Sequence, residues 1–107
     1  MELKKLSQRA VEIKKLYTKM EMEKFGKKWT NAQVAQGFVG DVGDLMELVM
    51  AKDGIREIEK VDEKLAHELS DCLYCILLLS EGYGVNIEKA FFKTMNELEK
   101  KLGKYKK

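Results

Sequence analysis

Two acidic segments decide the fold of this chain: Gly40-Asp41-Val42-Gly43-Asp44-Leu45-Met46-Glu47 and His67-Glu68-Leu69-Ser70-Asp71. Each carries two carboxylates three residues apart, and on an α-helix such residues share one face with Cβ atoms about 5–6 Å apart. Two helices that face each other through these segments would bring four carboxylates together, each pair repelling by roughly 4 kcal/mol at 4 Å and an effective dielectric near 20. A hard divalent cation removes that cost. The segments therefore predict a Mg²⁺ site, with Mn²⁺ as a substitute, held by Asp41, Asp44, Glu68 and Asp71.

Length and composition place the chain among small helical proteins. Its 107 residues predict a single domain, residues 1–107, and the absence of proline favours long uninterrupted helices. A net charge of +2 gives no electrostatic reason to expect a nucleic-acid partner. The longest apolar run, residues 72–79, is far too short to span a membrane, and no export signal precedes it. We therefore expect a cytoplasmic protein with no membrane contact.

Apolar periodicity and end signals predict four helices. Gly26 is a candidate stop for the first helix, Thr30 and Gln33 fit a capping box, and Asp62 and Asn86 are candidate N-caps for the third and fourth. The expected helices cover residues 3–24, 30–52, 62–81 and 86–102. Four helices with short connections indicate an all-α fold that resembles an antiparallel four-helix bundle.

The apolar run at residues 72–79 carries a further expectation. A helix that is apolar on nearly every side lies at the centre of a protein or in an interface, so this run predicts an oligomer held together by helix packing. Cys72 and Cys75 form a C-x-x-C pattern inside the run. With no second cysteine pair, we interpret them as buried core residues rather than as a redox or zinc pair.

Three glycines interrupt the second predicted helix, at positions 37, 40 and 43. Each interior glycine costs about 1 kcal/mol relative to alanine, so they require a physical reason. Close packing of another helix and close approach of a ligand explain them equally well.

Two residues beside the acidic pairs have open roles. Glu47, three residues beyond Asp44, is either a further metal ligand, a catalytic general base that orients water, or an exposed acid. His67 is the only histidine, and on a helix it points about 100° away from Glu68. We expect it at the surface or beside a ligand rather than on the metal. Zinc and di-iron sites need more histidine or cysteine than the segments offer.

The acidic segments resemble those of a known family. The first is similar to the Gly-Glu-Val-Gly-Glu-Leu-x-Glu motif of MazG-like nucleotide pyrophosphohydrolases, and the second to their Glu-Glu-Leu-Ser/Ala-Asp-Val-Leu motif. The stretch Gly84-Val85-Asn86-Ile87-Glu88-Lys89-Ala90 resembles a third motif of the family. The resemblance extends from residue 29 to about residue 96.

This resemblance implies a Mg²⁺-dependent enzyme of the all-α superfamily that hydrolyses nucleoside triphosphates to monophosphate and pyrophosphate. Its substrates would be dNTPs or modified NTPs, and its role the cleansing of the nucleotide pool. It implies a homodimer or homotetramer, with Asp41, Asp44, Glu68 and Asp71 as metal ligands. Trp29 is a candidate for stacking on the nucleobase, although a core-anchoring role explains it equally well.

Two departures from the family leave alternatives. Aspartate replaces the usual glutamate at 41 and 44, which shortens each side chain by roughly 1.5 Å; glycines 40 and 43 would let the helices approach to compensate. Lys93 and Asn96 stand near, but out of register with, a lysine and asparagine that contact substrate in relatives. The alternatives are therefore an oligomerising or regulatory module with weakened catalysis, or hydrolysis of a related nucleotide such as phosphoribosyl-ATP.

Overall fold

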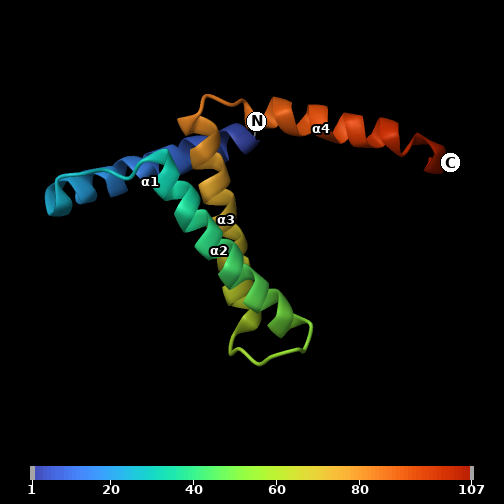
Figure 1. Cartoon of the computed structure of the whole chain (residues 1–107), viewed down its shortest axis with the longest axis horizontal. Coiled ribbons are helices and arrows are strands. Elements are labelled where there is room, and N and C mark those ends of the chain that lie inside the picture. Colours follow the sequence, from blue (N-terminus) through green and yellow to red (C-terminus); the bar gives the residue numbers. More distant parts are fainter. Residues whose placement is uncertain (1, 107) are drawn as a thin grey trace.

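The computed structural model describes residues 2–106, which form helices and connections without a strand (Figure 1). The elements are α1 (Glu2–Phe25), α2 (Asn31–Lys52), α3 (Val61–Gly82), α4 (Ile87–Lys101) and a short 3₁₀ turn, η1 (Gly103–Tyr105). The predictions of an all-α fold and of four α-helices are confirmed, and the observed bounds lie within two residues of the expected ones.

Local signals account for three of the helix ends. The chain turns out of α1 at Gly26, whose φ of 67° is readily adopted only by glycine. At the start of α2 the predicted capping box is complete: the Gln33 backbone N–H donates to Thr30 Oγ1 at 3.2 Å, and the Thr30 backbone N–H donates to Gln33 Oε1 at 2.9 Å. At α4, the side chain of Asn86 accepts a hydrogen bond from the Lys89 backbone N–H at 3.1 Å.

The start of α3 differs from the prediction. Lys60, not Asp62, is the N-cap residue, in a left-handed conformation with φ 55° and ψ 41° and no side-chain cap. Asp62 lies inside the first turn, where a negative charge is favourable beside the helix N-terminus. Its carboxylate forms an ion pair with Lys52 at the end of α2. Asp62 thus contributes a contact between α2 and α3 instead of capping its own helix.

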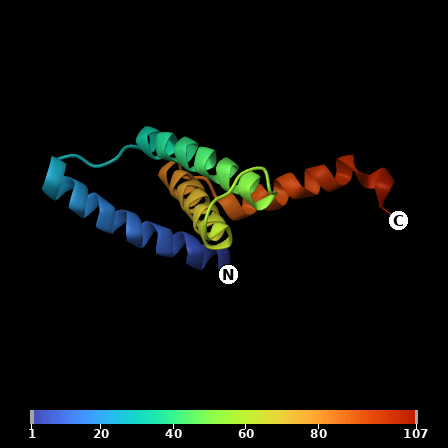
Figure 2. The ribbon, with the colours of Figure 1, turned by 90° about the horizontal axis from the view of Figure 1, so that it is seen from below.

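The centre of the fold is an antiparallel hairpin of α2 and α3, with α1 crossing one end of α3 (Figures 1 and 2). The Asn31 side-chain amide donates to the Gly82 carbonyl at 3.2 Å and joins the start of α2 to the end of α3. The buried core cluster comes from all three helices and comprises Ala10, Val34, Cys75, Leu77 and Leu78.

The apolar run of α3 is buried in the core on one side only. Cys72, Cys75, Leu77 and Leu78 are buried, and both cysteines are free thiols, as expected of core residues. Other large apolar side chains of the same run, among them Leu73, are exposed in the single chain. The run therefore packs against α1 and α2 and still presents an apolar face outward.

The single chain does not close a four-helix bundle. In Figures 1 and 2, α4 leaves the end of α3 and points away from the hairpin, and all of residues 91–101 are exposed. Its apolar stripe is thus left without a partner in the part of the chain described here. The bundle prediction holds for the number and type of helices, but not for the place of α4.

The shape of the chain is open. Its radius of gyration is 17.2 Å, whereas a compact domain of this length has about 13 Å. Its accessible surface is 8743 Å², about 2,600 Å² more than expected for a compact monomer of this mass. None of the helices within residues 2–106 combines the length and the apolar content that a membrane span requires.

Candidate metal centre

Three of the four predicted ligands meet across the hairpin. Asp41 and Asp44 come from α2 and Glu68 from α3, and one carboxylate oxygen of each lies within 4.8 Å of the others. Ligand oxygens of an octahedral Mg²⁺ ion are about 3.0 Å apart when adjacent and about 4.2 Å apart when opposite. The three carboxylate oxygens would therefore have to move closer together to hold one ion.

Glu68 carries the strongest sign that a cation belongs here. Its residue is 9% exposed, and its Oε2 atom has no hydrogen-bond partner within residues 2–106. Burial raises the pKa of the Glu68 carboxyl, and the negative charges of Asp41, Asp71 and Asp44 raise it further. A buried carboxylate without a partner is costly, and a divalent cation would supply the missing partner.

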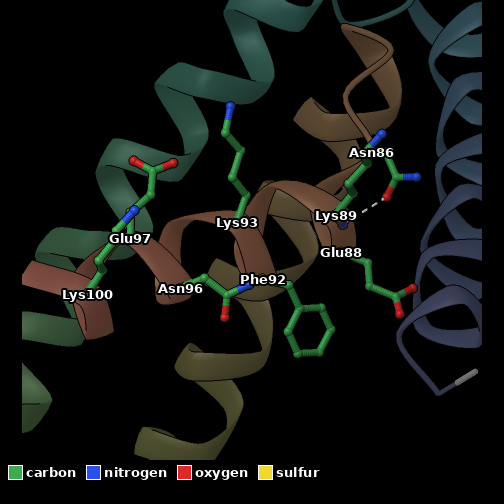
Figure 3. A pocket seen from close by; sticks show the side chains of 8 residues that line it. All are labelled: Asn86, Glu88, Lys89, Phe92, Lys93, Asn96, Glu97 and Lys100. Carbon is green, nitrogen blue, oxygen red and sulfur yellow. Dashed lines mark hydrogen bonds between the residues drawn. The ribbon is translucent and has the colours of Figure 1, made fainter. Parts of the chain in front are cut away.

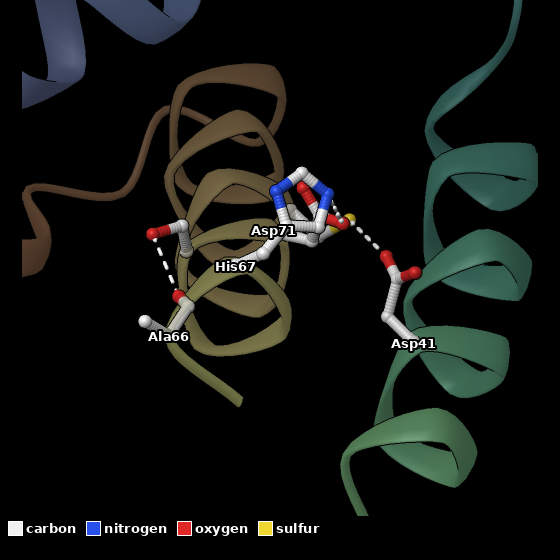
Figure 4. Close-up of polar contacts among 6 residues, drawn as sticks. Asp41, Ala66, His67 and Asp71 are labelled. Atoms are coloured by element: carbon white, nitrogen blue, oxygen red, sulfur yellow. Dashed lines mark hydrogen bonds and ion pairs between the residues drawn. The ribbon is translucent and has the colours of Figure 1, made fainter. Parts of the chain in front are cut away.

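Asp71, the fourth predicted ligand, lies beside this group. The Nε2 atom of His67, one turn earlier on α3, lies 3.2 Å from the Asp71 carboxylate (Figure 4). It is close enough to Glu68 to raise the pKa of that carboxyl, but it is not one of the three that converge. His67 is exposed at the surface, in agreement with the expectation that it is not a ligand itself.

The Cys75 thiol contacts the centre from within the core. Its Sγ donates to Asp41 Oδ2 at 3.5 Å across the α2–α3 interface (Figure 4). Burial, the hydrogen bond to Asp41 and that residue's charge raise the pKa of the Cys75 thiol to about 11, so the thiol stays protonated and orients Asp41 as a donor. Sequence reasoning missed this contact, although Cys75 lies four residues after Asp71 and hence on the same face of α3.

Glu47 lies next to the three carboxylates without joining them. Its carboxylate forms an ion pair with Arg56 at 3.0 Å. It shares a cavity of about 380 Å³ with Asp44, Glu68 and Lys64. Of the roles left open by the sequence, this position is that of an exposed acid, and Glu47 is not one of the three carboxylates that converge.

A second cavity, of about 480 Å³, borders the centre on the side of α1. Asp41 and Asp71 are part of its wall, together with aromatic side chains from α1, α3 and the loop between α1 and α2. Trp29, the predicted stacking residue, is one of them, and its ring comes to 3.4 Å from the position that a Cβ on Gly37 would take. The carboxylate centre thus lies between two cavities: charged side chains line most of one, and aromatic side chains form part of the wall of the other.

Lys93 and Asn96 are placed elsewhere. Both lie on an open, exposed face of α4, which none of the predicted metal ligands lines (Figure 3). Because α4 points away from the hairpin, a single chain does not bring these two residues to the carboxylates.

The glycines of α2 have different surroundings. Gly37 receives the Trp29 ring, whereas a Cβ at Gly40 or Gly43 would meet nothing within 4 Å among the described residues. Closer packing of α2 on α3 at these two glycines, expected as compensation for the shorter aspartates, is therefore absent. Asp41 and Asp44 approach Glu68 without it.

Fold and site together give an all-α chain in which three carboxylates on two facing helices could hold a metal ion. No protein-family model, no curated protein and no solved structure matches the chain. The resemblance to MazG-like enzymes accordingly remains a prediction from the sequence motifs.

Proposed function

We propose that this protein is a Mg²⁺-dependent nucleoside triphosphate pyrophosphohydrolase of the MazG-like type, which releases a nucleoside monophosphate and pyrophosphate. One observation carries the proposal. The Glu68 carboxylate is buried, its Oε2 lacks a partner within the described chain, and it points into a cluster with Asp41 and Asp44. Acidic clusters at a surface are common, but the Oε2 atom of Glu68 is buried without a partner, and a cation shared with Asp41 and Asp44 would supply one.

The donor set fits Mg²⁺ rather than a softer metal. Three carboxylates offer hard oxygen ligands, which Mg²⁺ and Mn²⁺ prefer, and the protonated Cys75 thiol donates to Asp41 instead of offering sulfur to a metal. When bound, Mg²⁺ would neutralise the charge of a triphosphate and polarise its phosphorus.

The neighbouring residues would prepare the site for that chemistry. Cys75 restrains the orientation of Asp41 through a hydrogen bond, and His67 lies beside Asp71. Lys64 brings a positive charge to the wall of the cavity that Asp44 and Glu68 line, where it would attract phosphate oxygens. Glu47, paired with Arg56, would orient the attacking water.

A pyrophosphate-release assay tests the proposal. The pure protein is incubated with Mg²⁺ and a panel of canonical and modified dNTPs and NTPs that includes phosphoribosyl-ATP. We expect pyrophosphate and monophosphate from at least one nucleotide, and none after chelation with EDTA. Asp44→Asn should lower turnover about 10- to 100-fold, because Asp44 is exposed and water can take over part of its role.

Asp53→Asn is the matched control. Asp53 is exposed at the end of α2, outside the cluster, so this variant makes the same chemical change and should keep wild-type turnover. Release of no pyrophosphate with either Mg²⁺ or Mn²⁺ would contradict the proposal and favour a non-catalytic module.

We also propose that the protein self-associates as a dimer or tetramer. The surplus of about 2,600 Å² of accessible surface per chain, or about 5,200 Å² for two chains, lies at the upper end of the total area that obligate homodimers bury. Four exposed apolar side chains of α4 and of the residue that follows it lie on one face: Phe91, Met95, Leu98 and Leu102. A second copy of the chain is the partner that would restore a closed bundle around this stripe.

Light scattering coupled to size exclusion checks this proposal. We expect a mass of two or four copies of the 12.4 kDa chain. Leu98→Lys, which places a charge in the stripe, should shift the protein towards smaller species, whereas Asn96→Lys on the polar side of α4 should not. A monomeric wild type at micromolar concentration would contradict self-association.

A further inference from the structure

The aromatic cavity beside the metal centre has the character of a stacking site. Its wall includes Tyr17, Phe25, Trp29 and Tyr74, which come from α1, the loop that follows it, and α3. Flat rings that face a cavity of about 480 Å³ suit another flat ring, and stacking of a nucleobase on an aromatic side chain is worth roughly 1–3 kcal/mol. The apolar wall thus favours an aromatic ligand without choosing among bases.

One charged residue in this wall, Glu21, can distinguish one nucleobase from another. Glu21 of α1 is 7% exposed and lines the cavity among the rings. Its Oε1 atom accepts the backbone N–H of Trp29 at 3.0 Å, the single hydrogen bond that this side chain forms within residues 2–106. An ionised carboxylate only accepts hydrogen bonds and has about four sites for them, so most of the accepting capacity of Glu21 remains available to a ligand.

The cavity also joins the metal centre. Asp41, one of the three converging carboxylates, and Asp71 beside them form part of the same wall as Glu21. A nucleotide whose phosphates lay at the carboxylates would therefore have its base among the aromatic rings, with the base edge towards Glu21.

The hydrogen-bonding groups of the bases indicate which nucleotide would fit this cavity. Guanine presents two adjacent donors on one edge, N1–H and the 2-amino group, which match the two oxygens of a carboxylate. Hypoxanthine has the same ring and N1–H but lacks the amino group. In uracil and thymine, a carbonyl oxygen stands on each side of the single N–H, and both oxygens would be repelled by the carboxylate.

We propose that this cavity is a nucleobase site in which Glu21 accepts hydrogen bonds from N1–H and the 2-amino group of guanine. The position of the phosphates rests on the proposed function, whereas the base preference rests on the cavity alone. Glu21 thus has two roles: it fixes the backbone of Trp29, and it selects a guanine nucleotide.

Trp29 makes the proposal measurable because it is the only tryptophan of the chain. Its fluorescence is followed while GMP, IMP or UMP is added in EDTA, so that neither metal nor turnover contributes. We expect GMP to change the emission at concentrations about 10- to 100-fold lower than IMP, since one hydrogen bond to a charged group is lost. UMP should bind more weakly still. Equal responses to GMP and IMP, or no response to any nucleotide, would overturn the proposal.

Glu21→Gln separates selection from structure. The amide oxygen of glutamine can still accept the Trp29 N–H, but the amide nitrogen presents donors to the donors of guanine. The variant should lose the preference for GMP over IMP while keeping the wild-type circular dichroism and unfolding midpoint. Glu23→Gln, an exposed position on the same helix, is the matched control and should keep the preference. A Glu21→Gln protein that still prefers GMP would show that Glu21 serves only to anchor the loop.

Repeating the titration with Mg²⁺ distinguishes this proposal from the proposed function. If the phosphates bind at the carboxylates, Mg²⁺ should tighten all three nucleotides by a similar factor. A preference for GMP without any effect of Mg²⁺ and without pyrophosphate release would reject the hydrolase and retain the guanine site. Pyrophosphate release without a base preference would retain the hydrolase and reject the guanine site.

Discussion

Glu68→Gln is expected to have opposite effects on stability and on activity. In the metal-free protein it should raise the free energy of unfolding by about 1–3 kcal/mol, because it removes a buried charge whose Oε2 has no partner and which lies beside Asp41, Asp44 and Asp71. Metal-dependent turnover should fall more than about 100-fold, since loss of a direct ligand costs more than loss of the groups that orient ligands.

Urea denaturation in EDTA and the pyrophosphate assay in Mg²⁺ measure the two effects on the same preparation. Protein concentration must be held constant, because self-association also contributes to stability. Glu57→Gln is the matched control: Glu57 is exposed in the connection between α2 and α3, and its substitution should alter neither quantity. A Glu68→Gln protein that is less stable in EDTA than wild type would mean that Glu68 is part of a stabilising network and not a vacant ligand.

The second large effect is expected on the free energy of unfolding, which Mg²⁺ should raise by an amount that depends on pH. Because the Glu68 pKa is raised in the fold, folding favours the protonated carboxyl. The stability that protonation supplies is complete below the ordinary pKa of a glutamate, and it is lost as the pH rises through the raised pKa. The metal-free protein should therefore become less stable across that interval.

Mg²⁺ should act in the opposite direction over the same interval, since it binds the deprotonated carboxylates. At a concentration one hundred times its dissociation constant it would add about 2.7 kcal/mol. Unfolding curves at several pH values, with MgCl₂ or with KCl of equal ionic strength, measure this increment. It should shrink as the pH is lowered and be absent from Glu68→Gln. An increment that is the same in that variant would place the bound Mg²⁺ elsewhere on the chain.

Local sequence signals predicted the helices well. The capping box of Thr30 and Gln33 and the Asn86 cap are correct because each depends on atoms only three residues apart. The predicted N-cap of α3 was wrong by two residues, since Lys60 is the cap and Asp62 lies in the first turn of the helix. Asp62 pairs with Lys52 at the end of α2, a contact that the cap pattern of a single helix does not encode.

The carboxylate cluster was predictable in part. The spacing of Asp41 and Asp44 placed both on one helix face, and with Glu68 they are the three of the four predicted carboxylates that converge across the hairpin. The position of Asp71 was not predictable, because its contact with His67 depends on side-chain rotation. Lys93 and Asn96 could not be placed either, because their distance from the centre depends on the direction in which α4 leaves α3.

The sequence by itself determined four helices and the shared face on which the acidic residues stand, because helix formation and i, i+3 spacing are local properties of the chain. Only the tertiary structure decided that Glu21 would be buried beside Trp29 and that Cys75 would donate to Asp41. Glu21 and Trp29 are 8 residues apart, so their contact depends on how the loop after α1 folds back on that helix. Cys75 and Asp41 are 34 residues apart, so their contact depends on the alignment of α2 with α3, which no local pattern encodes.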